Sequence, residues 1–170
     1  DDFGWHDVAS TNSDGFIDRS EWDLLRNLGV VDYGLIAVRL GGRGDLTQTG
    51  VAWRNKKTYD SLTSPLIYKG VLYLVKSGGI IGSMDPLTGQ VFKIDRTKQA
   101  MEGYYASPVA ADDKVILASE AGKVTVLKAG RQWEILAVND LGEECYATPA
   151  IAAGKIFIRT RSALYCFGKK

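Results

Sequence analysis

The stretches Thr63-Ser64-Pro65, Ala106-Ser107-Pro108 and Ala147-Thr148-Pro149 decide how this chain folds. Their prolines, Pro65, Pro108 and Pro149, lie 43 and then 41 residues apart, and each is followed by an apolar run, a turn and a second apolar run. A repeat of about 40–50 residues built from short strands is typical of the blades of a β-propeller. A single blade cannot bury both of its faces, so the repeats predict blades that pack on one another.

Turn residues such as those of Lys69-Gly70 and Thr88-Gly89 divide each repeat into short strands. The first two repeats are expected to contain four strands each, over residues 65–68, 71–75, 80–84 and 91–94, and over residues 106–110, 115–119, 124–128 and 133–138. The third is expected to contain three, over residues 147–152, 155–160 and 163–167. Residues 35–40 and 51–54 are interpreted as the last two strands of a preceding blade.

The predicted fold is therefore all-β, a partial propeller of about three to four four-stranded antiparallel blades with a small helical segment at its N-terminus. The predicted boundaries are 1–30 for that segment, 31–60 for a partial blade, 61–103 and 104–144 for two blades, and 145–170 for a blade that lacks its last strand. We interpret the chain as the C-terminal part of a longer propeller. The alternative is a homo-oligomer in which two chains pair through their open blade edges.

Composition excludes several classes of function. The chain has 170 residues, of which 21 are basic and 20 acidic, so its net charge of +1 offers no field that would attract nucleic acid. It contains no apolar run of about 18 residues, so no membrane span is predicted. No signal peptide is visible, and a chain that begins Asp1-Asp2 is interpreted as processed or excised. Cys145 and Cys166 should lie at opposite ends of one blade, which predicts two free, mostly buried thiols.

Residues 10–21, STNSDGFIDRSE, follow the twelve-residue calcium-binding loop of an EF-hand at all but one key position. The predicted metal ligands are Ser10, Asn12, Asp14, Phe16 through its carbonyl, Asp18 through a water, and Glu21. Gly15 supplies the sharp turn, and Ser10 departs from the pattern because an aspartate is expected there. A neutral first ligand predicts weak calcium binding, in the range of about 10⁻⁴–10⁻³ M.

The same loop has an interpretation that needs no metal. Asp18 and Glu21 have the spacing of a capping box, in which each side chain accepts a hydrogen bond from the backbone of the other residue. Such a box would start the following helix by itself. Both interpretations remain open on the sequence.

Other candidate residues have ordinary structural explanations. Gly41-Gly42-Arg43-Gly44 is interpreted as a turn rather than a phosphate-binding loop, and His6, the single histidine, as a solvated residue. Tyr104-Tyr105 and Tyr146 stand just before two of the repeat turns, where they pack between blades or line a binding surface. Arg159 and Arg161 are solvated or face an anionic partner, and the acidic residues 139–144 form a surface loop or a second cation site.

Met84-Asp85-Pro86-Leu87-Thr88-Gly89 resembles the Asp-x-x-Thr-Gly turn of the PQQ-like, or quinoprotein-like, β-propeller repeat. This family includes quinoprotein alcohol dehydrogenases and the outer-membrane assembly lipoprotein BamB. The family's docking tryptophan would fall at Lys93, which is a departure. The resemblance implies an exported protein of the periplasm, the cell envelope or the extracellular space. It does not imply a bound quinone, because the dehydrogenases hold PQQ with an adjacent cysteine pair that this chain lacks.

The leading hypothesis for function is a non-catalytic binding or scaffold module with a weak calcium-binding loop. Its partners would be another protein or the remaining propeller blades. The alternative is a fragment of a PQQ-dependent oxidoreductase whose active site other blades complete.

Overall fold

The structure, a computed structural model, describes residues 14, 16–23, 34–47, 49–56 and 62–168. The chain divides into two compact units, residues 1–33 and residues 34–170, and each is considered by itself. In the first unit residues 19–23 form a short helix. Within the described residues, no helix is long and apolar enough to cross a membrane.

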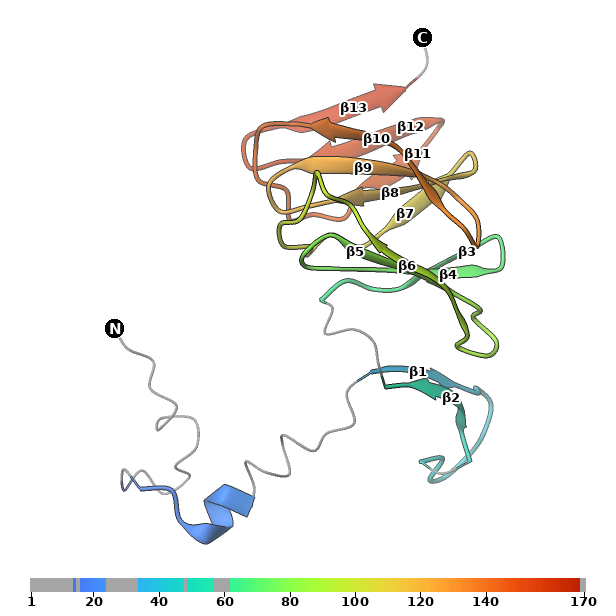
Figure 1. Cartoon of the computed structure of the whole chain (residues 1–170), viewed down its shortest axis with the longest axis vertical. Coiled ribbons are helices and arrows are strands. Elements are labelled where there is room, and N and C mark those ends of the chain that lie inside the picture. The colour runs from blue at the N-terminus through green and yellow to red at the C-terminus, as the bar shows by residue number, and fades with distance from the viewer. Residues whose placement is uncertain (1–13, 15, 24–33, 48, 57–61, 169–170) are drawn as a thin grey trace. The chain divides into compact units, whose positions relative to one another are not determined.

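The described part of the second unit consists of four antiparallel sheets, which we name blades A to D (Figure 1). Blade A contains β1 (Leu35–Val38) and β2 (Val51–Asn55). Blade B contains β3 (Leu66–Tyr68), β4 (Val71–Lys76), β5 (Ile80–Met84) and β6 (Val91–Arg96). Blade C contains β7 (Val109–Ala111), β8 (Lys114–Ala118), β9 (Lys123–Lys128) and β10 (Glu134–Asp140). Blade D contains β11 (Ala150–Ala152), β12 (Lys155–Arg159) and β13 (Leu164–Gly168).

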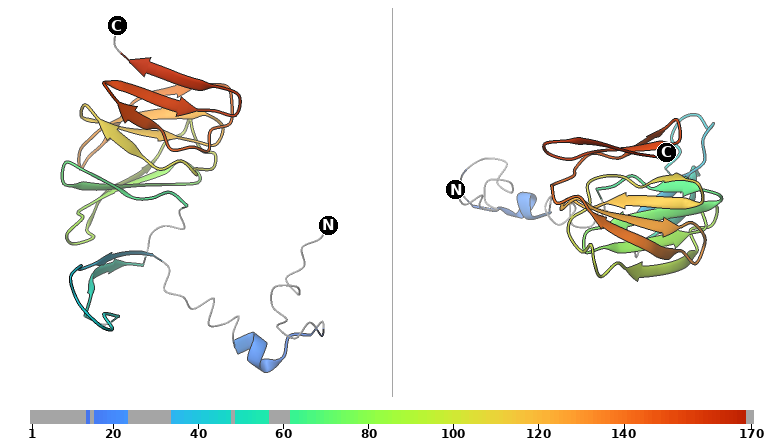
Figure 2. Two further views of the ribbon diagram at one scale, coloured as in Figure 1. Left: turned by 180° about the vertical axis from the view of Figure 1, so that it is seen from behind. Right: turned by 90° about the horizontal axis from the view of Figure 1, so that it is seen from above.

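The predicted fold class is confirmed: the sheets are those of a partial propeller with four-stranded antiparallel blades. In Figure 2 blades B and C lie face to face, each with its strands in sequence order. The first strands of blades C and D begin at Val109 and Ala150, three residues later than predicted.

The Ser/Thr-Pro turns join neighbouring blades instead of extending the first strands. The Ser64 N–H donates to Ser107 Oγ at 3.0 Å, and the Ser107 N–H donates to Thr148 Oγ1, also at 3.0 Å. The proline that follows has no N–H to give to a strand ladder. The repeat that identifies the blades therefore also links each blade to the next.

Strand register gives the blades a common set of equivalent positions. Tyr73 pairs with Leu66 in blade B as Ile116 pairs with Val109 in blade C. A register shift interrupts the pairing of the last two strands at the same place in blades A, B and C. The positions that face the preceding blade are Leu72, Leu74 and Met84 in blade B, Val115, Leu117 and Leu127 in blade C, and Ile156, Ile158 and Phe167 in blade D.

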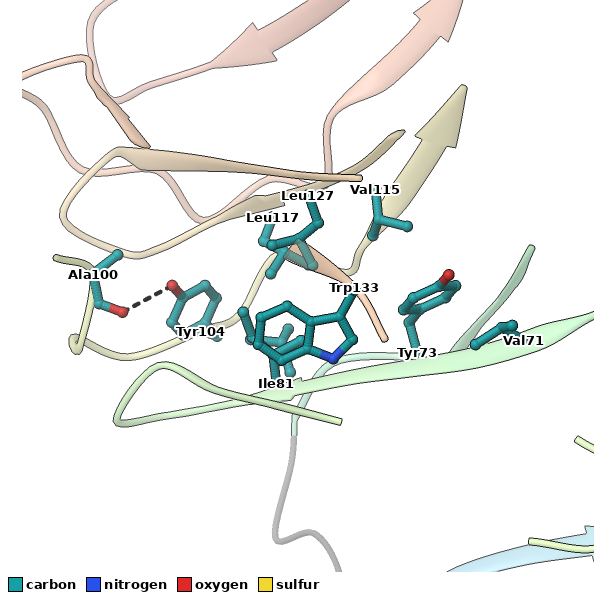
Figure 3. Close-up of a cluster of buried hydrophobic side chains, with 10 residues drawn as sticks. Val71, Tyr73, Ile81, Ala100, Tyr104, Val115, Leu117, Leu127 and Trp133 are labelled. Atoms are coloured by element: carbon teal, nitrogen blue, oxygen red, sulfur yellow. Dashed lines mark hydrogen bonds between the residues drawn. The ribbon is translucent and has the colours of Figure 1, made fainter. Parts of the chain in front are cut away.

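Trp133 occupies the centre of the interface between blades B and C (Figure 3). It follows β9 in the turn that leads to β10, and its side chain is almost completely buried. Tyr73, Ile81, Leu117 and Leu127 belong to the same buried cluster. Burial of one large aromatic side chain between two sheets stabilises their contact by several kcal/mol, about 3–5 kcal/mol on removal.

Polar groups of blade B hold the backbone of the turn that carries Trp133. Ser83 Oγ donates to the carbonyl of Arg131 at 2.7 Å, and Lys93 Nζ donates to the carbonyl of Trp133 at 2.8 Å. Lys93 Nζ also lies 4.1 Å from the centre of the Trp133 ring, a cation–π contact. The Gly130 N–H donates to the hydroxyl of Tyr73 at 2.6 Å. Apolar burial and hydrogen bonds together hold this turn on blade B.

Blades A and B meet in a related way. Trp53 in β2 stands at the position equivalent to Lys93, since each pairs with the residue just before the register shift. Its Nε1 donates to the carbonyl of Pro86 at 3.0 Å. Gly89, with φ +72°, lies directly under the ring, and a Cβ there would come within 2.6 Å of the indole. The Thr-Gly turn therefore requires glycine for this close approach.

The prediction for the cysteines was half right. Both thiols are free, and Cys145 is buried, but Cys166 is exposed. Cys166 in β13 is equivalent to Val126 in β9, a position on the face directed at the following blade. Among the described residues none packs on this face of β13, which accounts for the exposure of Cys166.

Replacement of Trp133 by alanine should lower the free energy of unfolding by about 3–5 kcal/mol, because a large side chain leaves a packed interface. Trp133→Phe should cost clearly less, since it keeps most of the apolar contact and removes an indole N–H that has no hydrogen-bond partner among the described residues. Urea unfolding followed by circular dichroism measures both. Leu87→Ala, at an exposed turn position, is the control and should change little. Equal effects of W133A and L87A would contradict this account of the interface.

Candidate protein-binding face

Large apolar side chains recur, exposed, just before the repeat turns. Leu62, Tyr105 and Tyr146 each precede a Thr/Ala-Ser/Thr-Pro triplet, and their exposed fractions are 76%, 47% and 51%. The rings of Tyr105 and Tyr146 touch, with centroids 5.4 Å apart and planes tilted by 56°. We call these three residues, one leucine and two tyrosines, the tyrosine row. Exposed aromatic side chains that gather on one surface are typical of protein-binding sites.

The sequence left two roles open for the tyrosines, packing between blades or lining a binding surface, and the neighbours Tyr104 and Tyr105 differ in role. Tyr104 packs between blades B and C, and its hydroxyl donates to the carbonyl of Ala100 at 2.9 Å (Figure 3). Burial raises the pKa of Tyr104 to about 12, so the phenol stays neutral. Tyr105 and Tyr146 remain at the surface. Tyr104 thus anchors the segment that presents Tyr105.

A hollow of about 250 Å³ lies beside Tyr146 and is lined by Glu144, Tyr146, Arg159, Thr160 and Arg161. Arg161 Nη1 lies 3.8 Å from Glu144 Oε2, and the Arg161 N–H donates to the carbonyl of Glu144 at 3.0 Å. The negative charge of Glu144 raises the pKa of Tyr146, with smaller contributions from burial and from Glu120. The hollow therefore offers a neutral phenol and two guanidinium groups beside one carboxylate. Arg159 and Arg161 line the same hollow, and the choice between a solvated pair and residues that face an anionic partner stays a prediction.

Glu143 ties the loop before blade D to the turn between β12 and β13. Its carboxylate accepts hydrogen bonds from Ser162 Oγ at 2.6 Å, from Thr160 Oγ1 at 2.7 Å and from the Ser162 N–H at 3.2 Å. Gly122, with φ +78°, passes so close to this loop that a Cβ would lie 2.0 Å from the carbonyl oxygen of Glu143. Residues 141–144 are thus a tethered surface loop, and Asn139 and Asp140, which the sequence assigned to the same loop or cation site, end strand β10. In the described part of the chain no three His, Cys, Asp or Glu side chains gather as metal ligands.

The described residues of the N-terminal loop form the predicted capping box. The Glu21 N–H donates to Asp18 Oδ1 at 2.9 Å, and the Asp18 N–H donates to Glu21 Oε2 at 3.1 Å. Asp14 accepts from the Phe16 N–H at 2.8 Å, as in an Asx turn. Ser10 and Asn12 lie outside the described residues. The capping box is confirmed, and calcium binding stays a prediction.

Sequence reasoning missed the residues that join blades A and B. Trp53 follows Gly50 by three residues, whereas Lys93 follows Gly89 by four, but Trp53 and Lys93 each stand eight residues after an aspartate, Asp45 and Asp85. This spacing from the aspartate was the available signal for a docking tryptophan at Trp53. The Gly41–Gly44 stretch lies between β1 and β2, where a turn was predicted.

Comparison with known proteins places this geometry in a family. A family described as "Outer membrane protein assembly factor BamB" matches residues 7–169. The chain belongs to the BamB family. No curated protein sequence matches it. The matched residues include all four blades, among them the blades that Trp53 and Trp133 join.

One solved structure supports the propeller fold. The crystal structure of BamB from Moraxella catarrhalis aligns with a TM-score of 0.57 and 19% sequence identity, over 69% of this chain and 36% of that one. The computationally designed Ika8 protein aligns with a TM-score of 0.37 and 13% identity, over 63% of this chain and 45% of that one. The chain thus spans about a third of the length of Moraxella BamB.

Protonation of Glu143 should release the turn between β12 and β13. Hydrogen bonds from Ser162 and then Thr160 lower the pKa of Glu143 below its ordinary value of 4.5. A lowered folded pKa means that this contribution to stability is complete above the ordinary value and is lost as the pH falls through the folded pKa. The amide shift of Ser162 in NMR spectra should therefore show a transition below pH 4.5.

Glu143→Gln provides the control, because glutamine keeps the size of the side chain and has no charge to titrate. Its Ser162 amide should show no such transition. A midpoint at or above the ordinary glutamate pKa in the unchanged chain would contradict the proposed role of these hydrogen bonds.

Proposed function

We propose that this chain is part of a non-catalytic, protein-binding scaffold of the cell envelope, and that it meets its partner through the tyrosine row. The observation that carries the proposal is the recurrence of exposed Leu62, Tyr105 and Tyr146 at equivalent places in three successive repeats. Structural needs account for the neighbouring residues: Ser107 and Thr148 bond between blades, and Tyr104 is buried. They do not account for three large apolar side chains in water.

Family membership supports the class of function. The family's name assigns BamB to outer membrane protein assembly, which is work done by protein contacts at the envelope. A periplasmic or envelope location follows as part of the proposal. The hollow beside Tyr146 adds polar groups, so a partner segment with an apolar contact and a hydrogen-bonding or acidic group fits the face.

Site-specific photo-cross-linking tests this proposal in the cells that make the protein. A benzophenone amino acid at Tyr105 or at Tyr146 should link the chain to one discrete protein, identified by mass spectrometry. The same group at Leu87, which is more exposed but lies on a turn away from the row, should not. A double variant with Tyr105→Ala and Tyr146→Ala should lose this partner and keep its melting temperature.

Identical cross-links from all three positions, or none from the tyrosines, would contradict the proposed face. Dye-linked alcohol oxidation after addition of PQQ and calcium would instead contradict the non-catalytic assignment and favour the oxidoreductase.

We propose calcium binding by residues 10–21 as a second function. Its support is the spacing of six potential oxygen ligands, of which four lie in the described part: Asp14, Phe16, Asp18 and Glu21. Glu21 would exchange its capping bond to the Asp18 N–H for bidentate binding of the ion. Because capping also works with glutamine, the metal and capping roles of Glu21 can be separated.

Terbium, a luminescent substitute for calcium, should be sensitised by Trp22 next to the loop, and millimolar calcium should displace it. Glu21→Gln should abolish most of this signal and preserve the helix. Asp45→Asn is a matched control, because Asp45 accepts bonds from Thr47 as Asp18 does from Ser20 but lies outside the loop. Equal signals from the unchanged chain and E21Q would remove the calcium proposal.

A further inference from the structure

A hollow of about 430 Å³ lies where the end of blade B meets the last strand of blade C. Blade B supplies the last two residues of β6 and the three that follow, and blade C supplies two residues of β10; together they are Asp95, Arg96, Thr97, Lys98, Gln99, Ile135 and Val138. We call this site the B–C hollow. Both blades are described over all four strands, so the hollow has a complete wall on each side. Its volume lies in the range of about 300–1,000 Å³ that ligand sites occupy.

The wall that blade B supplies is held in place. Thr97 and Ala100 are fully buried, and the Thr97 N–H donates to the carbonyl of Gly79 at 2.9 Å. Gly79 has φ +68°, and a Cβ there would lie 2.5 Å from the carbonyl oxygen of Ala100. The segment therefore lies directly against the Gly79 turn. Lys98 and Gln99 stand between its two buried residues, so their backbone is positioned before any ligand binds, which lowers the entropy cost of binding.

Two cations of the hollow lack a counterion. Among the described residues, neither Arg96 nor Lys98 takes part in an ion pair. Asp95 is the one carboxylate of the lining, and its charge is shared: its Oδ2 lies 3.9 Å from Lys93 Nζ, and its Oδ1 accepts from the Arg96 N–H at 2.8 Å. The lining thus keeps an uncompensated positive charge.

The fold of a blade does not require these cations. Strand register makes Arg96 in blade B equivalent to Asp140 in blade C, a residue of opposite charge. Two residues further along the chain, Lys98 corresponds to Gly142. The same places are therefore occupied by an acid and a glycine in the next repeat. Two neighbouring cations that neither the fold nor a described carboxylate explains suit an anionic group from outside, and guanidinium binds carboxylates with two parallel hydrogen bonds.

The remaining lining residues indicate what carries this anion. Ile135, which is 41% exposed, and Val138 form an apolar wall. Asp95 offers hydrogen-bond acceptors, and Gln99 offers both a donor and an acceptor. An inorganic phosphate would bring acceptors alone and would leave the apolar wall bare. A peptide segment brings a carboxylate, main-chain N–H groups and an apolar side chain together.

We propose that the B–C hollow binds a segment of a partner polypeptide in which an acidic residue stands beside an apolar one. The carboxylate pairs with Arg96 and Lys98, and the apolar side chain packs on Ile135 and Val138. This site shares no residue with the tyrosine row, and neither proposal depends on the other.

Selection of peptides tests the proposal without knowledge of the partner. A phage-displayed library of random heptapeptides is selected on the whole chain, and the bound phage are sequenced. Peptides with Asp or Glu beside Leu, Ile or Val should be enriched. The double variant with Arg96→Glu and Lys98→Glu should lose this enrichment. Both residues are exposed, so the variant should fold, and its melting temperature checks this.

A double variant with Lys128→Glu and Lys155→Glu is the matched control. It changes the net charge by the same amount at two exposed residues outside the hollow, so it should select the same peptides as the unchanged chain. Loss of enrichment in this control would show a long-range effect of charge and would overturn the proposal.

NMR titration locates the site of the most enriched peptide. The amide signals of Lys98, Gln99, Ile135 and Val138 should shift saturably. Replacement of the peptide's acid by its amide, or R96E/K98E in the chain, should weaken binding by at least about tenfold, as loss of a hydrogen bond to a charged group does.

Four results would overturn the proposal: no enrichment of acidic peptides, equal enrichment by R96E/K98E, shifts confined to other residues, or the same shifts with inorganic phosphate alone. Vesicles of phosphatidylglycerol provide a last comparison. If the chain binds them through Arg96 and Lys98 while no acidic peptide is enriched, an anionic lipid surface is the occupant and the proposal is wrong.

Discussion

The fit of one blade's last turn against the face of the preceding blade is the interaction on which the rest of this structure depends. Between blades B and C the turn brings Trp133 into a cluster with Tyr73 and Leu127, and Ser83 and Lys93 bond its backbone. Between blades A and B the order is reversed, since Trp53 reaches forward to the turn at Pro86. An indole ring thus fills both joints, although it comes from opposite sides. Each blade is consequently stable only against its neighbours, as in other repeat proteins.

This dependence explains where side chains are exposed. In blade C the positions that face blade B are buried, as Val115, Leu117 and Leu127 are. Phe167, which repeats the position of Leu127 in blade D, is partly exposed although it faces blade C, because no described turn covers it as the Trp133 turn covers Leu127. Cys166 repeats the position of Val126 and is exposed on the opposite face, where no described residue packs.

The sequence alone predicted the strands of the blades, because the residues that mark a strand or a turn lie close together in the chain. Proline spacing, Gly-containing turns and apolar runs set the strands to within a few residues, and the capping box of Asp18 and Glu21 follows from a three-residue spacing. It was insufficient for contacts between blades, which join residues about 40 positions apart, such as Ser64 with Ser107 and Lys93 with Trp133. The same limit explains Tyr104 and Tyr105: adjacent letters cannot show that one ring is buried and the other exposed.

Equivalent positions of the repeat carry different environments. The tyrosine row lies at the residue before each Thr/Ala-Ser/Thr-Pro triplet, where side chains are exposed although their neighbours Thr63 and Tyr104 are buried. Blades B and C differ at the positions that meet the turn of the following blade: where blade B has Tyr73, Ser83 and Lys93 to hold that turn, blade C has Ile116, Val126 and Ala137. A buried polar group without a partner costs about 1–3 kcal/mol, so the polar side chains of blade B are stabilising only while the Trp133 turn supplies their partners. Blade C, with apolar side chains at the same positions, carries no such requirement.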